Sequence, residues 1–470
     1  MNETAPPRPT LVRGLGPYMA VAVVVGTVIG SGVFKKPQVV AQNLPDLTWV
    51  AVAWIMGGVL AIMGALALAE VAVLYPRAGG NYVFLREGYG RWAGFLWGWV
   101  EFLIIRTASI AALATMFTES FRDILKEATG IDDPLQFWGE KGMTMSVILV
   151  LAIVNVRGVR WGGGLQLAIT VVKVASLLGI MVLPWVILGL GRSFPEFTTP
   201  SITNVPAEIT LSGFLTAFVG VIWAYHGWMN ITPVAEEIRN PQRNIPLALL
   251  GGVGIVMFVY LGANFAYHQV LPMWVMAQRD LTEPVATKFA MELVGSAGGL
   301  ILSAAIMCSV FGALNGNLLV GPRVLYAMGE DRLVPPALGA IHARFHTPAL
   351  AILATAAWSV LLILGVALLT WFEWIDSKTS HFDMLTNFAM FGALSLETLA
   401  ITTIFIFRWT LPSVERPYRC WGYPVVPALY IVGASVLVGV LVVYRPMTTW
   451  PGLIIVLLGV PVYYLWKRRG

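Results

Sequence analysis

The chain has 470 residues, of which 57% are hydrophobic and 12% are charged, and its formal net charge is +5. Soluble domains carry roughly twice that charged fraction, so this composition, with a mean hydropathy of +0.76, excludes a water-soluble globule. The bilayer is the expected solvent, and apolar runs of roughly twenty residues or more predict an all-α integral membrane protein rather than a barrel of short alternating strands. The basic excess is then orientation charge, and no nucleic-acid partner is expected.

The sequence predicts about twelve transmembrane helices joined by short connections, with no soluble domain between them. In chain order the spans are 15–43, 48–76, 88–118, 143–157, 162–190, 210–237, 246–270, 297–328, 348–369, 383–407, 423–444 and 450–466. Between the third and fourth spans we expect a mixed-charge surface loop with some helix, near 119–142.

The distribution of Lys and Arg predicts that both termini are cytoplasmic. With the N-terminus inside, about 18 of the 30 basic residues fall in inner segments and about 8 in outer ones. Two cysteines occur, Cys308 in an apolar run and Cys420 beside a basic loop, and they support neither a disulfide framework nor a metal site.

The first span is interrupted by the glycine-rich stretch "VVVGTVIGSGVF" over 23–34. Gly26, Gly30 and Gly32 weaken the helix there, and an unwound turn followed by a half-helix offers free N–H groups to an anion such as a carboxylate. Ser31 adds a hydroxyl. The alternative is that Gly26 and Gly30, spaced as G-x-x-x-G, only allow close helix packing.

The sixth span carries a second interruption, "WAYHGWMNITP", with Gly227 in mid-run and Pro233 after it. Free carbonyls at the end of its first half suit an ammonium group. Two interrupted helices five spans apart indicate an inverted repeat with a binding site at the bilayer midplane, and together the breaks favour an α-amino acid as ligand.

Several charged residues lie inside predicted spans. Lys173, in "ITVVKVASLLGI", is about 16 Å deep at 1.5 Å per residue and therefore needs a partner. Glu101 and Arg106 are five residues apart, share no α-helical face, and are not expected to pair directly.

Three further glutamates leave alternatives open. Glu397, in "LSLETLA", is a candidate proton carrier or a structural residue. Glu236 and Glu237 form with Arg239 and Arg243 either an inner gate or a solvated charge cluster.

Four segments resemble a known family, the amino acid–polyamine–organocation (APC) superfamily and its L-type amino acid transporter branch. They are "GTVIGSGVFKKP", "YPRAGGNYVFLREGYGRWAGFLWGWVEFLIIR", "IWAYHGWMNITPVAEEIRNPQRNIPLA" and "NGNLLVGPRVLYAMGEDRLVP", and the similarity covers about residues 15–345. The resemblance implies a LeuT-type fold of five plus five inverted helices with two appended helices. The domains are then a cytoplasmic tail 1–14, repeats 15–190 and 210–407, and two added helices 423–466.

The resemblance also implies a substrate site at the two interruptions. Its candidate residues are Thr27, Val28, Ile29, Gly30, Ser31, Gly32, Trp223, Ala224, His226 and Gly227. Backbone of the first break would hold the carboxylate, carbonyls of the second would hold the amino group, and Trp223 would be an aromatic gate. His226 departs from the family, which commonly has a small or acidic residue there. It either narrows the pocket, donates a hydrogen bond, titrates with pH, or packs against a neighbouring carbonyl.

Lys173 matches a fifth-helix lysine that, in related transporters, replaces the sodium ion of sodium-driven relatives. This implies a sodium-independent coupling role, as a fixed cation or a group that protonates during the cycle. The alternative is a lysine that only lines water.

The resemblance and the residues together favour a secondary transporter that moves amino acids by alternating access, either as an exchanger or with protons. Neutral substrates are favoured because no acidic residue stands in the second break; cationic amino acids or amines are the alternative. An enzyme or a channel is less favoured, and no cofactor, metal or nucleotide-binding loop is expected.

The expected partners are the amino acid and the lipid bilayer. A disulfide-linked heavy chain is not expected, because no cysteine lies between Glu119 and Gly142. The short loops and tails resemble bacterial members, so the expected location is the bacterial inner (plasma) membrane.

Overall fold

The computed structural model describes residues 11–197, 204–278, 283–374, 381–444 and 446–467. In these residues the regular elements are helices. One isolated β-bridge pairs Leu15 with Ile238 in the parallel sense. In chain order they are α1 (Pro17–Val28), α2 (Gly32–Ala41), α3 (Leu47–Leu74), α4 (Asn81–Tyr89), α5 (Arg91–Val100), the π-helix η1 (Glu101–Ile105), α6 (Arg106–Thr129), α7 (Gln136–Val156), α8 (Val159–Gly189), α9 (Leu211–Tyr225), the 3₁₀-helix η2 (Trp228–Glu237), α10 (Pro241–Val270), α11 (Met273–Met276), α12 (Val285–Val294), α13 (Ser296–Val320), α14 (Pro322–Glu330), η3 (Pro336–Gly339), α15 (Ala349–Trp371), α16 (His381–Thr410), α17 (Val425–Tyr444) and α18 (Pro446–Lys467).

Ten helical segments of the described chain are long and apolar enough to cross a bilayer, which agrees with the predicted membrane protein. The interrupted pair α9 and η2 falls outside these ten, because α9 has only 15 residues. The end of α18, Gly452–Lys467, is apolar but shorter than the ten.

The first span occupies the centre of the bundle, whereas α8 lies partly at its outside. In the most apolar window of Pro17–Ala41, 78% of residues are buried, against 28% for Trp161–Gly189. Large apolar side chains such as Val171 and Trp185 on α8 are exposed. Such residues would be a liability in water, but they match a lipid-facing surface.

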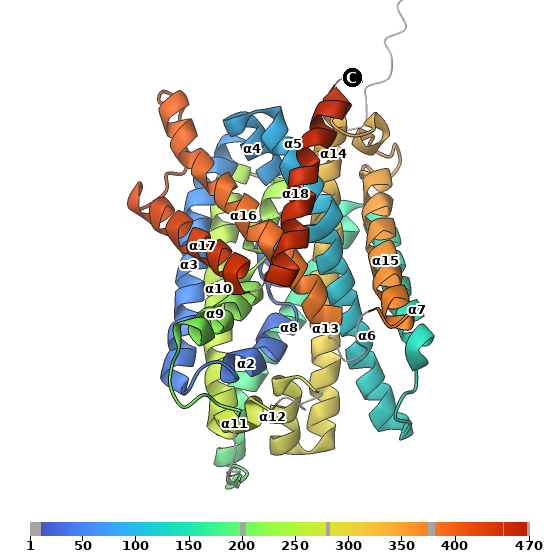
Figure 1. Cartoon of the computed structure of the whole chain (residues 1–470), viewed down its shortest axis with the longest axis vertical. Helices are drawn as coiled ribbons and strands as arrows, with labels where there is room; N and C mark the ends of the chain where they lie inside the picture. The colour runs from blue at the N-terminus through green and yellow to red at the C-terminus, as the bar shows by residue number, and fades with distance from the viewer. Residues whose placement is uncertain (1–10, 198–203, 279–282, 375–380, 445, 468–470) are drawn as a thin grey trace, which may run out of the picture.

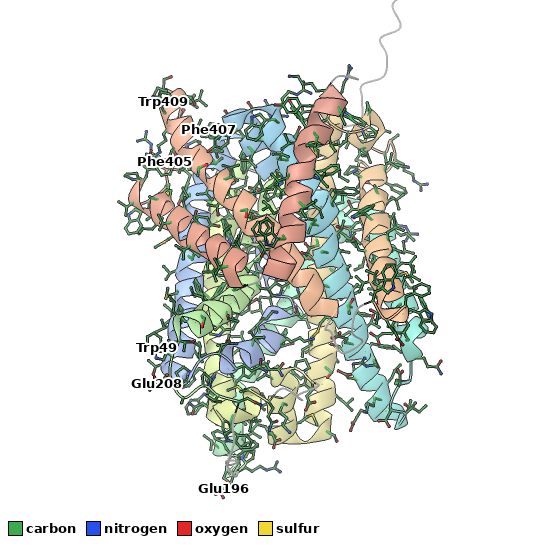
Figure 2. The ribbon with its side chains drawn as sticks, viewed as in Figure 1. Trp49, Glu196, Glu208, Phe405, Phe407 and Trp409 are labelled. Atoms are coloured by element: carbon green, nitrogen blue, oxygen red, sulfur yellow. The ribbon has the colours of Figure 1, made fainter. Side chains whose placement is uncertain are left out.

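The short helices α2 and α9 lie in the lower half of the view in Figure 1, while α16 crosses the front of the bundle with α17 and α18 beside it. Trp49, at the start of α3, lies in the lower half of the view, and Trp409, at the end of α16, lies near the top (Figure 2).

Residues 119–142 are more helical than the predicted surface loop. Helix α6 continues to Thr129, ends with Gly130 in the left-handed conformation (φ 70°), and α7 begins at Gln136. The short helices α11 and α12, between α10 and α13, were also not predicted, because each is too short to produce a spanning pattern.

Candidate functional site

The first helix interruption lies where the sequence predicted it. Helix α1 ends at Val28 and α2 begins at Gly32, so Ile29, Gly30 and Ser31 lie outside both helices. The amides of Ser31 and Gly32 make no backbone hydrogen bond that spans the break, as expected for the start of a helix. The break therefore presents free N–H groups at the positive end of α2.

The glycines of this break serve two purposes. A Cβ at Gly26 would lie 2.1 Å from Gln166 Nε2, so Gly26 allows close packing against α8, as the packing alternative proposed. A Cβ at Gly32 would lie 2.6 Å from Ala224 Cα, so Gly32 lets the two interrupted helices touch. At Gly30 the nearest atom to a Cβ, Leu113 Cδ2, would be 3.3 Å away, and Gly30 lines a cavity instead.

The second interruption also lies where it was predicted. Helix α9 ends at Tyr225, His226 is extended, and Gly227 adopts a left-handed conformation (φ 105°, ψ −4°) before η2 begins. Thr27 Oγ1 lies 3.2 Å from Gly227 O, and the Tyr260 hydroxyl lies 3.0 Å from both Val28 O and Ala224 O. These contacts hold the two breaks side by side.

A cavity of about 40 Å³ lies between the breaks, enough for about three water molecules. Its lining residues are Thr27, Val28, Gly30, Ser31, Gly32, Ser109, Leu113, Trp223, His226, Gly227, Asn230 and Asn317. Eight of the ten candidate residues therefore meet at one cavity. The other two, Ile29 and Ala224, are buried beside it, and their carbonyls accept hydrogen bonds from Lys173 and Tyr260.

Four lining residues were missed: Ser109 and Leu113 on α6, Asn230 on η2 and Asn317 on α13. The two asparagines stand in or beside apolar runs, where a polar residue needs a partner. That was the available signal for them. Ser109 and Leu113 are ordinary residues of a membrane helix and gave none.

Lys173 of α8 has the partners that its depth requires. Its ammonium donates to Gly26 O and Ile29 O, each 2.6 Å away, and the residue is 1% exposed. These carbonyls belong to the end of α1, where the helix dipole favours a cation. Ser309 Oγ lies 3.3 Å from Ile29 O and from Gly30 O. Lys173 therefore supports the first break rather than merely lining water.

Glu101 and Arg106 form an ion pair, which corrects the sequence-based expectation. Arg106 Nε donates to Glu101 Oε1 at 2.8 Å. The reason is the π-helix η1 over Glu101–Ile105, whose i→i+5 repeat places residues five apart on one face. Arg106 also donates to Asn317 Oδ1 at 2.6 Å and to Asn230 Oδ1 at 3.0 Å, so it fixes two residues of the cavity wall.

Glu397 of α16 contacts the second break. Its Oε1 lies 2.9 Å from His226 Nε2, and the two side chains are 4% and 16% exposed. The ring of Trp223 lies parallel to that of His226, with 6.1 Å between centroids and 8° between planes. His226 is thus held between a carboxylate and an indole ring.

The charge cluster at the end of η2 differs from the prediction. Glu237 pairs with Arg323 of α14, with Nε 2.8 Å from Oε1 and both side chains fully buried, rather than with Arg239 or Arg243. Glu236 accepts a hydrogen bond from the amide of Ala78 at 3.1 Å. The partner was missed because it is distant in the sequence.

A separate polar cluster joins the ends of α3 and α16. Glu70 accepts from Arg408 Nη2 at 2.7 Å and from the Cys420 amide at 2.6 Å. Burial, together with the nearby Glu70 carboxylate, raises the pKa of the Cys420 thiol in the α16–α17 connection to about 11. This thiol is therefore protonated at neutral pH and packs as an uncharged group.

Over the ranges that the structure describes, no group of three or more His, Cys, Asp or Glu side chains is placed to hold a metal ion. The site instead consists of two unwound helix segments, a small polar cavity and a buried lysine. This is the arrangement of a membrane carrier that binds its ligand at interrupted helices.

Comparisons with known proteins agree with that class. The amino acid permease family profile matches residues 15–463. The chain is 31% identical to the serine/threonine exchanger SteT of Bacillus subtilis over 98% of both chains. It is 29% identical to the human cystine/glutamate transporter, covering 98% of this chain and 86% of the relative. It is 28% identical to the human large neutral amino acids transporter small subunit 2, covering 98% and 82%.

The chain therefore belongs to the amino acid permease family of the APC superfamily. It is an integral membrane transporter of amino acids and not an enzyme, as the sequence predicted.

Proposed function

We propose that this protein is a secondary active transporter that exchanges neutral L-amino acids across the membrane by alternating access, without sodium. The observation that carries the proposal is the pair of helix breaks that meet at one cavity. The proposed architecture is a LeuT-type inverted repeat, 15–190 and 210–407, with two appended helices over 423–466. In this proposal the interrupted pair α9 and η2 and the helix α18 would each be a further span beside the ten long ones, for twelve in total.

The first break would bind the substrate carboxylate. The amides of Ser31 and Gly32 face the break at the positive end of α2, which is ten residues long. The Ser31 hydroxyl is buried and has no hydrogen-bond partner among the described residues, so it is available to a ligand. Lys173 stands on the other side of the break and adds a positive charge.

The second break would bind the substrate amino group. Helix α9 ends at Tyr225, where Gly227 reverses the backbone. Trp223 O accepts from the His226 amide and Ala224 O from the Tyr260 hydroxyl, and each carbonyl oxygen has a second lone pair that can accept from a ligand. The negative end of the α9 dipole favours an ammonium group. Trp223, which lines the cavity, would cover the bound substrate as a gate.

A neutral substrate fits the charges around the cavity. No acidic side chain lines it, and the nearest carboxylates, Glu101 and Glu397, are paired with Arg106 and His226. A substrate with a cationic side chain would have no unpaired carboxylate to bind in this cavity. Cationic amino acids and amines are therefore the less favoured substrate class. The names of the relatives, serine/threonine exchanger and large neutral amino acids transporter, support the same class.

Lys173 would couple ligand binding to the conformational change. It connects α8 to two carbonyls of the first break. A ligand that shifts the backbone of this break would therefore also shift α8. Exchange is the mode that the exchanger among the relatives supports. Proton symport, with Lys173 releasing its proton during the cycle, is the alternative.

The protein would work as a single chain in the bacterial plasma membrane with both termini in the cytoplasm. The segment between α6 and α7, where a disulfide to a heavy chain would be needed, contains no cysteine. The excess of Lys and Arg in the segments on the side of the termini supports the orientation.

Counterflow in proteoliposomes tests the proposal. Purified protein is reconstituted into vesicles that contain an unlabelled neutral amino acid, and labelled serine is added outside. An exchanger accumulates the label transiently and keeps it chemically unchanged. Equal uptake into loaded and empty vesicles would contradict exchange, and uptake only with a proton gradient would favour symport.

A further inference from the structure

The residue that departs from the family pattern, His226, occupies the wall of the proposed binding cavity. Its side chain is 16% exposed, although the surrounding residues of α9 and η2 are nearly all buried. It lines the cavity between the breaks and also a smaller one of about 10 Å³ on the side of Glu397. A glycine or alanine at this position would leave the volume of the imidazole ring empty. His226 therefore limits how large a substrate side chain can be.

The ring orientation is fixed on two sides. Nε2 lies 2.9 Å from Glu397 Oε1, and the ring stacks on Trp223. Because a carboxylate accepts hydrogen bonds, Nε2 carries the proton, and Nδ1 is then an acceptor in the neutral ring and a donor in the charged ring. Nδ1 has no partner among the described residues. A hydroxyl group can both accept and donate, so it matches Nδ1 in either state.

A second residue of the cavity wall, Asn230, offers a donor. Arg106 donates to Asn230 Oδ1 at 3.0 Å and to Asn317 Oδ1 at 2.6 Å, and an arginine can only donate. The oxygen of each amide must therefore face Arg106. The Asn317 amide nitrogen donates to Ala313 O. The Asn230 amide nitrogen makes no hydrogen bond to another described residue, and Asn230 lines the cavity.

The positive charge of Arg106 is neutralised by Glu101 at 2.8 Å, so the wall is polar without a net charge. Ser109 adds a hydroxyl group to the wall. This hydroxyl donates its hydrogen bond to Ile105 O, and its oxygen can still accept one from a ligand. The cavity thus combines a small volume with an imidazole nitrogen, an amide donor and a hydroxyl oxygen.

We propose that His226, positioned by Glu397, and Asn230 form the side-chain subsite of this transporter and select small amino acids that carry a hydroxyl group. This inference rests on the proposed amino acid site and names its substrate class. His226 and Asn230 contact the substrate hydroxyl. Glu397 is a positioning residue that acts through the imidazole ring.

Competition against labelled threonine in counterflow tests the subsite, because valine has the shape of threonine without its hydroxyl. In the wild-type protein we expect threonine and serine to compete at least about tenfold better than valine, since a valine would leave the polar wall unpaired. Leucine and phenylalanine should compete more weakly still because of their size. Equal competition by threonine and valine would overturn the proposal.

The variant His226→Ala should reduce the preference for threonine over valine about tenfold and improve competition by leucine, because the ring is removed from the wall. His268→Ala is the matched control, because His268 lies on α10 and bonds its own helix at Asn264 O, 2.8 Å away. An unchanged substrate profile in His226→Ala would remove the residue from the subsite.

Two variants of Glu397 distinguish a role in orienting the His226 ring from a general role in protein stability. Glu397→Ala releases the ring and should weaken threonine selectivity through a higher KM with little change in the maximal rate. Glu397→Gln keeps an acceptor for Nε2 and should restore the selectivity. A loss of rate in both variants with selectivity intact would contradict the positioning role.

The wild-type threonine and valine measurement does not depend on any variant folding, so it decides the proposal on its own. If the wild-type protein exchanges no amino acid, the proposed function fails. If it exchanges amino acids but prefers valine, leucine or phenylalanine, only the subsite fails.

Discussion

The two helix breaks differ in what supports them. The break between α1 and α2 consists of Ile29, Gly30 and Ser31, and side chains from other helices, Lys173 and Ser309, hold its carbonyls. The break between α9 and η2 carries its own large side chain, His226, and needs a left-handed glycine at Gly227. The first break exposes mainly peptide groups, whereas the second adds a side chain.

This difference suggests a division of labour. A site made from peptide groups recognises the amine and carboxylate that all α-amino acids share, and a site with side chains distinguishes between them. Changes at the first break should therefore affect every substrate equally. Changes at the second break should affect some substrates more than others.

The largest effect is expected from Gly30→Leu, which should abolish uptake of all substrates. A Cβ at Gly30 would already lie 3.3 Å from Leu113 Cδ2 and 3.5 Å from Ala313 Cβ, so three further carbons must fill the cavity. Counterflow measures the loss, and surface expression confirms insertion. Gly254→Leu, at an exposed α10 position with nothing within 4 Å of a Cβ, is the control and should retain uptake.

Lys173→Ala should lower the transport rate about 100-fold for every substrate, because it removes a charged hydrogen bond from two buried carbonyls at about 1–3 kcal/mol each, and only Ile29 O keeps the Ser309 hydroxyl nearby. The measurement is the initial rate of exchange in proteoliposomes. Lys288→Ala is the control, since Lys288 forms a partly exposed pair with Glu292 that contributes little. A wild-type rate and pH profile in Lys173→Ala would exclude a coupling role.

Gly227→Ala should reduce transport about tenfold and change relative substrate affinities. An alanine at φ 105° costs about 1–2 kcal/mol, and its Cβ would lie 3.2 Å from Asn230 Nδ2. Gly130→Ala imposes a similar left-handed strain at φ 70° with nothing within 4 Å. Both variants should lose thermal stability, but only Gly227→Ala should lose transport. Equal transport losses would show that the effect is general strain.

The smallest effect is expected from the replacement of sodium by choline, which should change uptake by less than about twofold. The Lys173 ammonium lies 2.6 Å from the carbonyls of Gly26 and Ile29, so these oxygens are not free to coordinate a cation. Uptake of labelled serine in the two salts is the measurement. Strict sodium dependence would contradict the role given to Lys173.

The sequence was sufficient for features that depend on local composition. Apolar length predicted the spans, and the glycines near 26–32 and at Gly227 predicted where two helices stop. Backbone preferences act over a few residues, so a local pattern is enough to identify them.

Features that depend on distant contacts could not be predicted. The Glu101–Arg106 pair required a π-turn, which a pattern of apolar residues does not reveal. The partners of Arg106, Asn230 and Asn317, are 124 and 211 residues away along the chain. Glu397 meets His226 across 171 residues, so the side-chain wall became visible only with the fold.

The close approach of Gly32 to Ala224 also has a mechanical consequence. No side chain separates Gly32 from Ala224, and the Tyr260 hydroxyl lies beside a carbonyl of each interrupted helix. The two breaks are therefore in direct contact and do not form two independent halves of the site. The two segments should move together during the transport cycle, so that the substrate contacts the same binding site in the inward-open and outward-open states. A cross-link engineered between these two segments should therefore leave turnover intact, whereas one that ties either of them to α6 should stop it.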